Sequence, residues 1–266
     1  MAEQPHLLVE KEGHVVTLTM NRPEAKNAWT LEMMARLWDA WQMIDGDDDV
    51  RVAILTGAGD AFCAGADLKM MHGDQSNNPW YAKFEEDPEL HWKAMLRHYR
   101  LKKPLIAAVD GIALGGGTEI VLTTDIRVAS ESSMFGLTEP KWALFPLGGS
   151  TVRLPRQIPY TMAMEMLLTG RMMKAEEAKA MGLIGTVVKS GEVLTHARML
   201  ANKIANNGPL AVQAIKKSAT EGLLKNELEA LKDELSIGSK IIFDTEDAKE
   251  GPQAFAEKRK PEFKGR

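Results

Sequence analysis

Apolar residues in the first half of the chain occur either in short runs or spaced three or four apart, and these two patterns predict strands and helices in alternation. Short apolar runs at residues 7–10 and 15–20 flank a turn near Gly13, which predicts a β-hairpin. Thr30 then precedes apolar residues spaced three or four apart, so it is placed to cap a helix. The apolar positions of this helix are Leu31, Met34, Leu37, Trp38, Trp41 and Ile44.

A unit of strand, loop of small residues and helix occurs twice. The buried strand at residues 50–55 leads to a short helix expected from Ala66, and the strand at residues 105–109 leads to a glycine-rich turn at 111–117. Between the two units, apolar spacing predicts a helix from residue 90 to about residue 102. The repetition indicates an α/β core.

The second half of the chain is mostly helical in its spacing. A last strand is expected at residues 183–188, and residues 191–256 carry helical spacing, broken at Pro209 and without strands. The sequence thus predicts an α/β core over residues 1–190 and a helical extension over residues 191–266.

Composition narrows the classes of protein that fit. The chain has 266 residues, of which 44% are hydrophobic and 26% charged, as in ordinary soluble globular proteins. Its formal net charge of −4 argues against a broad basic surface for nucleic acid or anionic membranes. No apolar run approaches the roughly 18 residues of a membrane span, the N-terminus lacks signal-peptide features, and Cys63 is the only cysteine. We therefore expect a cytoplasmic protein.

Several common catalytic motifs are absent. Neither glycine-rich turn supplies the lysine of a phosphate-binding loop, the dinucleotide fingerprint fails after Gly59, and Ser150 lacks the context of a nucleophile elbow. The six histidines show no metal-ligand spacing, so no metal site is expected, and His91 and His98 are interpreted as neighbours on a solvated helix. Cys63 has no nearby histidine and is interpreted as a small packed residue.

The two glycine-rich turns offer a different chemistry. Residues 115–117 strip side chains from a turn that enters a helix, and residues 62–68 have the same small-residue character. Two such turns facing one another can direct two backbone N–H groups at one oxygen, the geometry that stabilises an enolate formed from a thioester. The alternative is that both are tight turns where helices pack closely on strands.

Two glutamates lie near these turns. Glu119 sits in the first turn of the helix that the glycines open, and the alternative is that it only serves the helix dipole. Glu139 precedes Pro140, which disfavours a helical backbone and predicts an extended loop at the rim of a pocket, with a plain surface charge as the alternative. If burial separates their pKa values, the pair can supply a general base and a general acid.

Seven segments, in a fixed order, carry a resemblance to a known family: residues 21–28, 55–69, 104–119, 135–139, 168–171, 175–188 and 255–259. On these segments, which span nearly the whole chain, the sequence resembles the crotonase superfamily and, within it, the enoyl-CoA hydratases. The resemblance implies a spiral of ββα units with a C-terminal helical region used in forming a homotrimer, commonly as a dimer of trimers.

The resemblance also implies roles for individual residues. Ala66 and Gly116 match the positions whose backbone N–H groups hold the thioester oxygen, and Glu119 and Glu139 match the two catalytic glutamates of the hydratases. Other crotonases often lack one of these glutamates, so the presence of both favours water addition over isomerisation. In the implied mechanism Glu119 orients the water, while Glu139 donates the α-proton in hydration and is the base in dehydration.

Contacts to coenzyme A follow in the same way. Two lysines, Lys69 and Lys258, match candidates for the CoA phosphates, and the tail at residues 257–266 holds five basic and two acidic residues. The positions that match contacts around the adenine are Ala25, Ala64, Asp67 and Leu68. CoA is part of the substrate, so no separate cofactor is expected.

The sequence departs from the family after the second glutamate. Many hydratases have Pro-Gly-Ala-Gly-Gly there, with a glycine near the catalytic water, whereas this chain has Leu147 in that place. We expect Leu147, Trp142, Phe145 and the loop at residues 72–80 to shape the acyl pocket, and core packing is the alternative for the two aromatics.

The expected function is hydration of a 2-enoyl-CoA to a 3-hydroxyacyl-CoA. One alternative is an enoyl-CoA isomerase, which needs only one carboxylate; another is a non-catalytic relative that binds acyl-CoA or RNA. No basic segment with interleaved aromatics is present, which argues against RNA. Two buried carboxylates suit a pure binder of an anionic ligand poorly.

Overall fold

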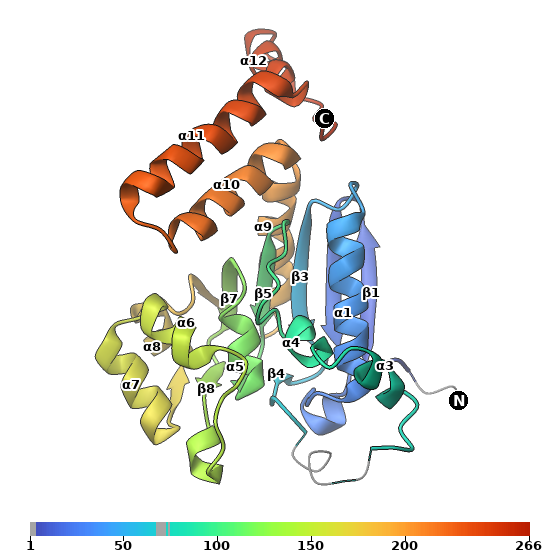
Figure 1. Cartoon of the computed structure of the whole chain (residues 1–266), viewed down its shortest axis with the longest axis vertical. Coiled ribbons are helices and arrows are strands. Elements are labelled where there is room, and N and C mark those ends of the chain that lie inside the picture. The colour runs from blue at the N-terminus through green and yellow to red at the C-terminus, as the bar shows by residue number, and fades with distance from the viewer. Residues whose placement is uncertain (1–3, 68–72, 74) are drawn as a thin grey trace.

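The computed structural model describes residues 4–67, 73 and 75–266, whose strands form two sheets (Figure 1). The larger sheet has the strand order β1 (Leu7–Glu12), β2 (Val15–Met20), β3 (Val52–Gly57), β5 (Leu105–Val109), β7 (Ile126–Ser130) and β10 (Thr186–Val188). β1 and β2 pair antiparallel, which confirms the predicted hairpin, and the other neighbours pair parallel.

The smaller sheet explains why the sequence repeats itself. Its strands are β4 (Ala61–Cys63), β6 (Ile112–Leu114), β8 (Met134–Gly136) and β9 (Met172–Lys174), in that order. β4, β6 and β8 run parallel, and β9 pairs antiparallel with β8. The successive pairs β3–β4, β5–β6 and β7–β8 each add one strand to each sheet, so the chain winds as the expected spiral.

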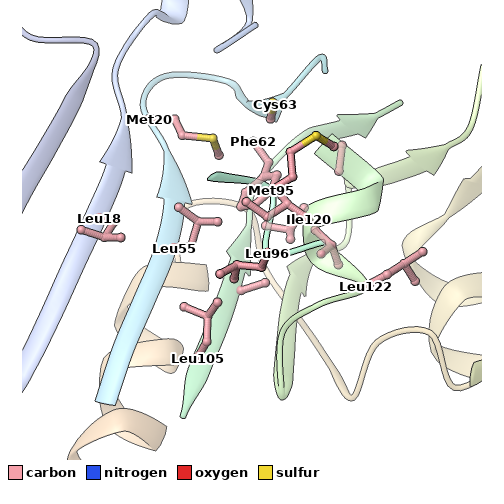
Figure 2. Packing of buried hydrophobic residues seen from close by; sticks show 14 of the residues in the cluster. Leu18, Met20, Leu55, Phe62, Cys63, Met95, Leu96, Leu105, Ile120 and Leu122 are labelled. Atoms are coloured by element: carbon pink, nitrogen blue, oxygen red, sulfur yellow. The ribbon is translucent and has the colours of Figure 1, made fainter. Parts of the chain in front are cut away.

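The central strands β3 and β5 of the larger sheet are buried on both faces, and their side chains alternate between two cores. In β3, Val52 and Ile54 pack toward α9 (Val193–Ala205), while Ala53 and Leu55 join the main core on the other face. This alternation is the period of two that a strand imposes on its side chains. Figure 2 shows Leu55, Leu105 and Ile120 converging in that main core.

Helix α1 (Leu31–Gly46) begins as predicted, because the Thr30 hydroxyl accepts a hydrogen bond from the Met33 amide at 3.1 Å. The helix expected to reach residue 102 is wrong in its length, since α4 (Leu90–Ala94) ends early. Leu96 adopts a left-handed backbone with φ of 53°, which buries its side chain in the main core. Tertiary burial therefore overrides the helical spacing here.

Most of the remaining helices lie in the connections between successive strands. These are η1 (Pro23–Ala25), α3 (Tyr81–Glu86), α5 (Gly116–Val121), η2 (Glu139–Trp142), α6 (Ser150–Gln157), α7 (Tyr160–Thr169) and α8 (Ala175–Ala180). The short helix expected from Ala66 does not begin there, because Ala66 forms an isolated parallel bridge with Trp29, and residues 68–72 of that helix lie outside the described ranges. The last strand begins only at Thr186, and none of the four short strands of the smaller sheet has a counterpart among the strands predicted from the apolar pattern.

The C-terminal region is helical, as expected. It continues from α9 into α10 (Pro209–Gly222), α11 (Glu227–Asp244) and α12 (Asp247–Ala256). α9 itself packs on the larger sheet, and the three later helices lie beyond the end of that sheet, away from α3 (Figure 1). No helix in the described ranges is long and apolar enough to cross a membrane.

Candidate active site

Three loops meet at one edge of the smaller sheet. β4, β6 and β8 are parallel neighbours, so their carboxyl ends lie side by side. Ala66 follows β4, Gly116 follows β6 and Glu139 follows β8, each within three residues of the strand end. The spiral therefore brings together residues that are far apart in the sequence, and each belongs to the site predicted from the sequence.

Hydrogen bonds fix the loop after β6 against the end of β8. The Gly115 amide donates to the Gly136 carbonyl at 2.8 Å, and the Thr118 hydroxyl accepts from the Gly136 amide at 3.1 Å. The loop after β4 approaches just as closely, since a Cβ on Gly65 would lie 2.9 Å from the Gly116 nitrogen. Gly65 also has a φ of +88°, so both the lack of room for a side chain and the left-handed backbone favour glycine at this position.

The amides of Ala66 and Gly116 are available to a ligand. Ala66 is held by its bridge to Trp29, whose own amide donates to the Gly65 carbonyl at 2.8 Å. Gly116 is the first residue of α5, so no carbonyl of that helix can accept its N–H. Within the described part of the chain, neither amide donates a hydrogen bond, and both residues line a cavity of about 580 Å³.

Glu119 lies at the bottom of this cavity and is fixed by three donors. Its side chain is on α5 and the residue is 3% exposed. Oε2 accepts from the Gly148 amide at 2.9 Å, and Oε1 accepts from the Ser150 amide at 3.1 Å and from the Ser150 hydroxyl at 2.8 Å. Three donors directed at one carboxyl group suit its ionised form. The sequence reasoning missed Gly148 and Ser150, although the Gly-Gly-Ser turn was a visible signal.

Two arginines hold the turn that supplies these donors. Arg153 donates through Nη1 to the Gly148 carbonyl at 2.9 Å and through Nη2 to the carbonyls of Leu96 and Arg97 at 3.1 and 2.8 Å. Arg97 donates through Nε to the Leu147 carbonyl at 2.7 Å. Burial lowers the pKa of Arg153, and the nearby Glu119 opposes that change. The turn is thus fastened to the segment after α4.

Glu139 has the opposite surroundings. Its Oε2 is buried and has no hydrogen-bond partner in the described part of the chain. Burial raises the pKa of Glu139 to about 7, and the charge of Glu119 adds to the increase. The extended loop predicted at Glu139 is wrong, because Glu139 begins η2 with Pro140 as its second residue. Proline fits the first turn of a helix, where its missing N–H is not needed.

Seven of the 24 described residues that line the cavity are aromatic. Its aromatic lining residues are Trp29, Tyr81, Phe84, His91, Trp92, Trp142 and Phe145. Trp142, Phe145 and Leu147 line the cavity as expected, and their exposed fractions of 67%, 65% and 53% rule out core packing for the two aromatics. Of the loop at residues 72–80, Gln75 lines the cavity and residues 72 and 74 lie outside the described ranges.

The structure confirms the interpretation of Cys63 and corrects that of His91. Cys63 is buried, its Sγ donates to the Asn27 carbonyl at 3.2 Å, and burial raises its pKa to about 12, which confirms the packed residue. His91 is not on a solvated face: it is half-buried, lines the cavity and packs against Phe84 with ring centroids 4.4 Å apart. His98 is exposed. No group of residues in the described ranges could hold a metal ion.

The residues expected to contact CoA are only partly brought together. Ala64 and Asp67 line the cavity, and Asp67 forms an ion pair with Arg22 at 3.3 Å. Ala25 ends η1, outside the cavity lining. Leu68 and Lys69 lie outside the described residues. Lys258 follows α12, at the end of the molecule away from α3, so one chain alone does not place it at the cavity (Figure 1).

Comparison with known proteins gives one consistent family. The model of the enoyl-CoA hydratase/isomerase family matches residues 10–266. The chain is 54% identical to enoyl-CoA hydratase EchA19 of Mycobacterium tuberculosis, covering 98% of this chain and 97% of that protein. It is 43% identical to (E)-benzylidenesuccinyl-CoA hydratase of Thauera aromatica, covering 97% of this chain and 98% of that protein.

Solved structures agree with the sequence comparison. The crystal structure of an enoyl-CoA hydratase from Mycobacterium tuberculosis H37Rv matches with a TM-score of 0.89 and 40% identity, covering 99% of this chain and all of that one. Enoyl-CoA hydratase EchA1 from Mycobacterium marinum matches with a TM-score of 0.89 and 41% identity, over 99% and 100% of the two chains. With the fold, the loops and both glutamates in place, the chain belongs to the enoyl-CoA hydratase/isomerase family.

Proposed function

We propose that the chain hydrates the 2,3 double bond of a 2-enoyl-CoA to a 3-hydroxyacyl-CoA, with Glu119 and Glu139 as its catalytic pair. One observation carries the proposal: two glutamates face one cavity in opposite environments, beside two backbone amides with no partner in the described chain. A pair of carboxyl groups tuned apart is the arrangement needed to handle water and a proton in one step.

The amides of Ala66 and Gly116 would hold the thioester oxygen. Hydrogen bonds from two fixed amides stabilise the negative charge that develops on this oxygen as water adds to the β-carbon. They gain more from the enolate-like transition state than from the neutral thioester, so they lower the barrier rather than only tightening binding.

The two carboxyl groups would divide the handling of water between them. Glu119 accepts three hydrogen bonds from the protein, which leaves a lone pair on Oε2 to accept one from the water. The water oxygen bonds to C3 while Glu139 gives its proton to C2. The second proton of the attacking water passes to Glu139, which starts the next cycle protonated. Dehydration reverses these steps: the protonated Glu139 gives its proton to the departing hydroxyl and takes the C2 proton in its place.

Assembly would complete the CoA site. The apolar side chains exposed on α10, α11 and the turn between them would be covered by further copies in a homotrimer or a dimer of trimers; they include Leu223, Leu224, Leu228, Leu231 and Leu235. Such packing would let Lys258 reach the CoA phosphates of a neighbouring copy. Lys69 would contact the CoA phosphates of the chain's own substrate, and its adenine would be contacted by Ala25, Ala64, Asp67 and Leu68. A cytoplasmic location, with no nucleic-acid partner, stays a prediction.

An isomerase remains the second candidate because the family includes isomerases. An isomerase shuttles one proton and needs one carboxylate. Here both glutamates line the cavity, and Glu119 is held in place by hydrogen bonds from Gly148 and Ser150. The products separate the two activities. Hydration gives a 3-hydroxyacyl-CoA, and isomerisation gives a shifted double bond.

The test follows the loss of the conjugated thioester absorbance with enoyl-CoAs of increasing bulk. We expect Glu119→Gln and Glu139→Gln each to lower kcat by about 10²–10⁴-fold. Glu131→Gln is the matched control, since Glu131 is exposed in the turn between β7 and β8. Full hydration rates in both site variants would refute the proposed mechanism. A non-catalytic binder would bind the CoA thioester and turn over none.

A further inference from the structure

The cavity continues past the two glutamates along one face of α4. Met95 lies where Glu119 and the Gly148 backbone meet, since a Cβ on Gly148 would approach both Met95 Cε and Glu119 Oε2. The Met95 amide donates to the His91 carbonyl at 3.1 Å, so His91 lies one helical turn before Met95 and on the same face. One turn adds about 6 Å along the cavity wall.

His91 is a polar group on this part of the cavity wall. Its ring packs against Phe84 at 4.4 Å between centroids, tilted by 57°, and lies 6.3 Å from the ring of Trp92. Among the described residues, the imidazole has no hydrogen-bond or ion-pair partner. Burial lowers the pKa of His91, which favours the neutral ring at physiological pH.

A neutral imidazole offers one donor and one acceptor. An apolar acyl group that filled the cavity and expelled water would leave both unpaired, whereas a hydroxyl or carbonyl oxygen would pair with at least one of them. A carboxylate is a poorer match, because no lysine or arginine is among the described residues that line the cavity. The chemistry at this point therefore favours an uncharged polar group.

We propose that His91 is a specificity-determining residue that favours 2-enoyl-CoA substrates with a hydroxyl or carbonyl oxygen about 6 Å beyond the reacting carbons. This substrate preference rests on the proposed hydratase function. It selects among acyl groups through a side chain at the wall of the cavity, away from the two glutamates and the two amides. His91 takes no part in the addition of water.

The test compares 2-octenoyl-CoA with its 8-hydroxy, 7-oxo and 8-carboxyl analogues. We expect kcat/KM of the wild type to be about tenfold higher for the hydroxyl and oxo compounds than for the plain chain, with the carboxylate no better than the plain chain. His91→Phe should remove this preference and His91→Gln should restore part of it. His98→Phe, which changes an exposed histidine of the same segment, should keep the wild-type ratios.

Crotonyl-CoA, too short to reach His91, reports on the integrity of the site and should be hydrated by every variant within about twofold of the wild type. A wild type that prefers the plain chain, or a His91→Phe variant with unchanged ratios, would overturn the proposal. If the wild type hydrates none of these compounds, the hydratase function itself fails. The same preference is then measured as the ratio of Kd values for octanoyl-CoA and 8-hydroxyoctanoyl-CoA.

Discussion

The turn that carries Glu119 and the turn that carries Glu139 border the same cavity, yet the two carboxyl groups differ in the hydrogen bonds that they accept. Glu119 is almost fully buried and receives three hydrogen bonds from Gly148 and Ser150. Glu139 keeps one buried oxygen without a partner in the described chain, and its pKa is raised to about 7. One carboxyl group thus accepts three hydrogen bonds from the protein, and the other has a buried oxygen that accepts none within the described chain.

The difference shows that the role of a carboxyl group here is set by backbone supplied from elsewhere. The donors to Glu119 come from Gly148 in the loop before α6 and from Ser150, the first residue of α6, which lie 29 and 31 residues further along the chain. In the described part of the chain no equivalent donor reaches Glu139 Oε2, so burial outweighs the one backbone hydrogen bond that lowers the pKa of Glu139, and its protonated form persists near neutral pH. Breaking the loop should therefore make the two sites more alike and should impair catalysis.

Gly148→Ala is expected to have the largest effect. The new methyl group would lie 2.6 Å from Glu119 Oε2, closer than real contacts allow, so the carboxylate must move. A displacement of about 1 Å in a catalytic group can cost about a hundredfold in rate, and we expect kcat to fall by that order. Steady-state kinetics with crotonyl-CoA would measure it.

Gly46→Ala is the matched control for that substitution. Gly46 is the last residue of α1, and a Cβ there meets nothing within 4 Å. Alanine is the better helix former, so stability should be equal or slightly higher and kcat unchanged. If Gly148→Ala were as active as Gly46→Ala, the turn would not be what positions Glu119.

Arg153→Met should have the next largest effect, a loss of about tenfold in kcat with little change in KM. The substitution removes three hydrogen bonds that fasten Gly148 to the segment after α4, and it removes a cation near Glu119. Arg156→Met is the control, because Arg156 is exposed and donates only to the Val152 carbonyl. Equal kinetics for the two variants would show that Arg153 has no positioning role.

The sequence predicted the parts of the site that come from local repetition. A strand, a loop of small residues and a helix recur, so the two small-residue turns and the place of Glu119 in its helix follow from the pattern, whereas Ala66 and Gly116 were assigned through the family resemblance. Glu139 was found by its place in the sequence, although its backbone was predicted wrongly. In each of these cases the signal lies within a few residues of the functional group.

The missed parts depend on contacts between distant segments. The hydrogen bond from Ser150 to Glu119 joins residues that are 31 positions apart, so no periodic pattern in the sequence indicates it. His91 has the spacing of a solvated helix, and only the fold shows that α4 turns this face toward Phe84 and the cavity. Helix α4 ends before Leu96, because Leu96 adopts a left-handed backbone that buries its side chain in the main core. Local helix propensity does not indicate this ending.

The pH dependence of the rate tests the raised pKa of Glu139. Hydration needs the protonated form of Glu139, so kcat/KM should fall as the pH rises through about 7. The reaction consumes no net proton, so its equilibrium constant is independent of pH and dehydration must fall in parallel. Initial rates in both directions across this range would show it. A rate that rises through pH 7 would mean that the ionised form of Glu139 is the active one.

The smallest expected effect is on stability. The pKa of Glu139 is higher in the folded chain than its ordinary value of 4.5, so the folded state holds a proton that the unfolded state has released between these two values. Stability contributed by this group is therefore full at low pH and is lost as the pH rises toward about 7.

Glu139→Gln removes the ionisable group, so its Tm should exceed that of the wild type by a few degrees at most at pH 8 and by less at pH 5. Thermal unfolding of both proteins at the two pH values measures the difference, and Glu131→Gln, exposed and outside the cavity, should show none. An equal gain at both pH values would mean that the amide stabilises by packing and that the ionised carboxylate costs nothing.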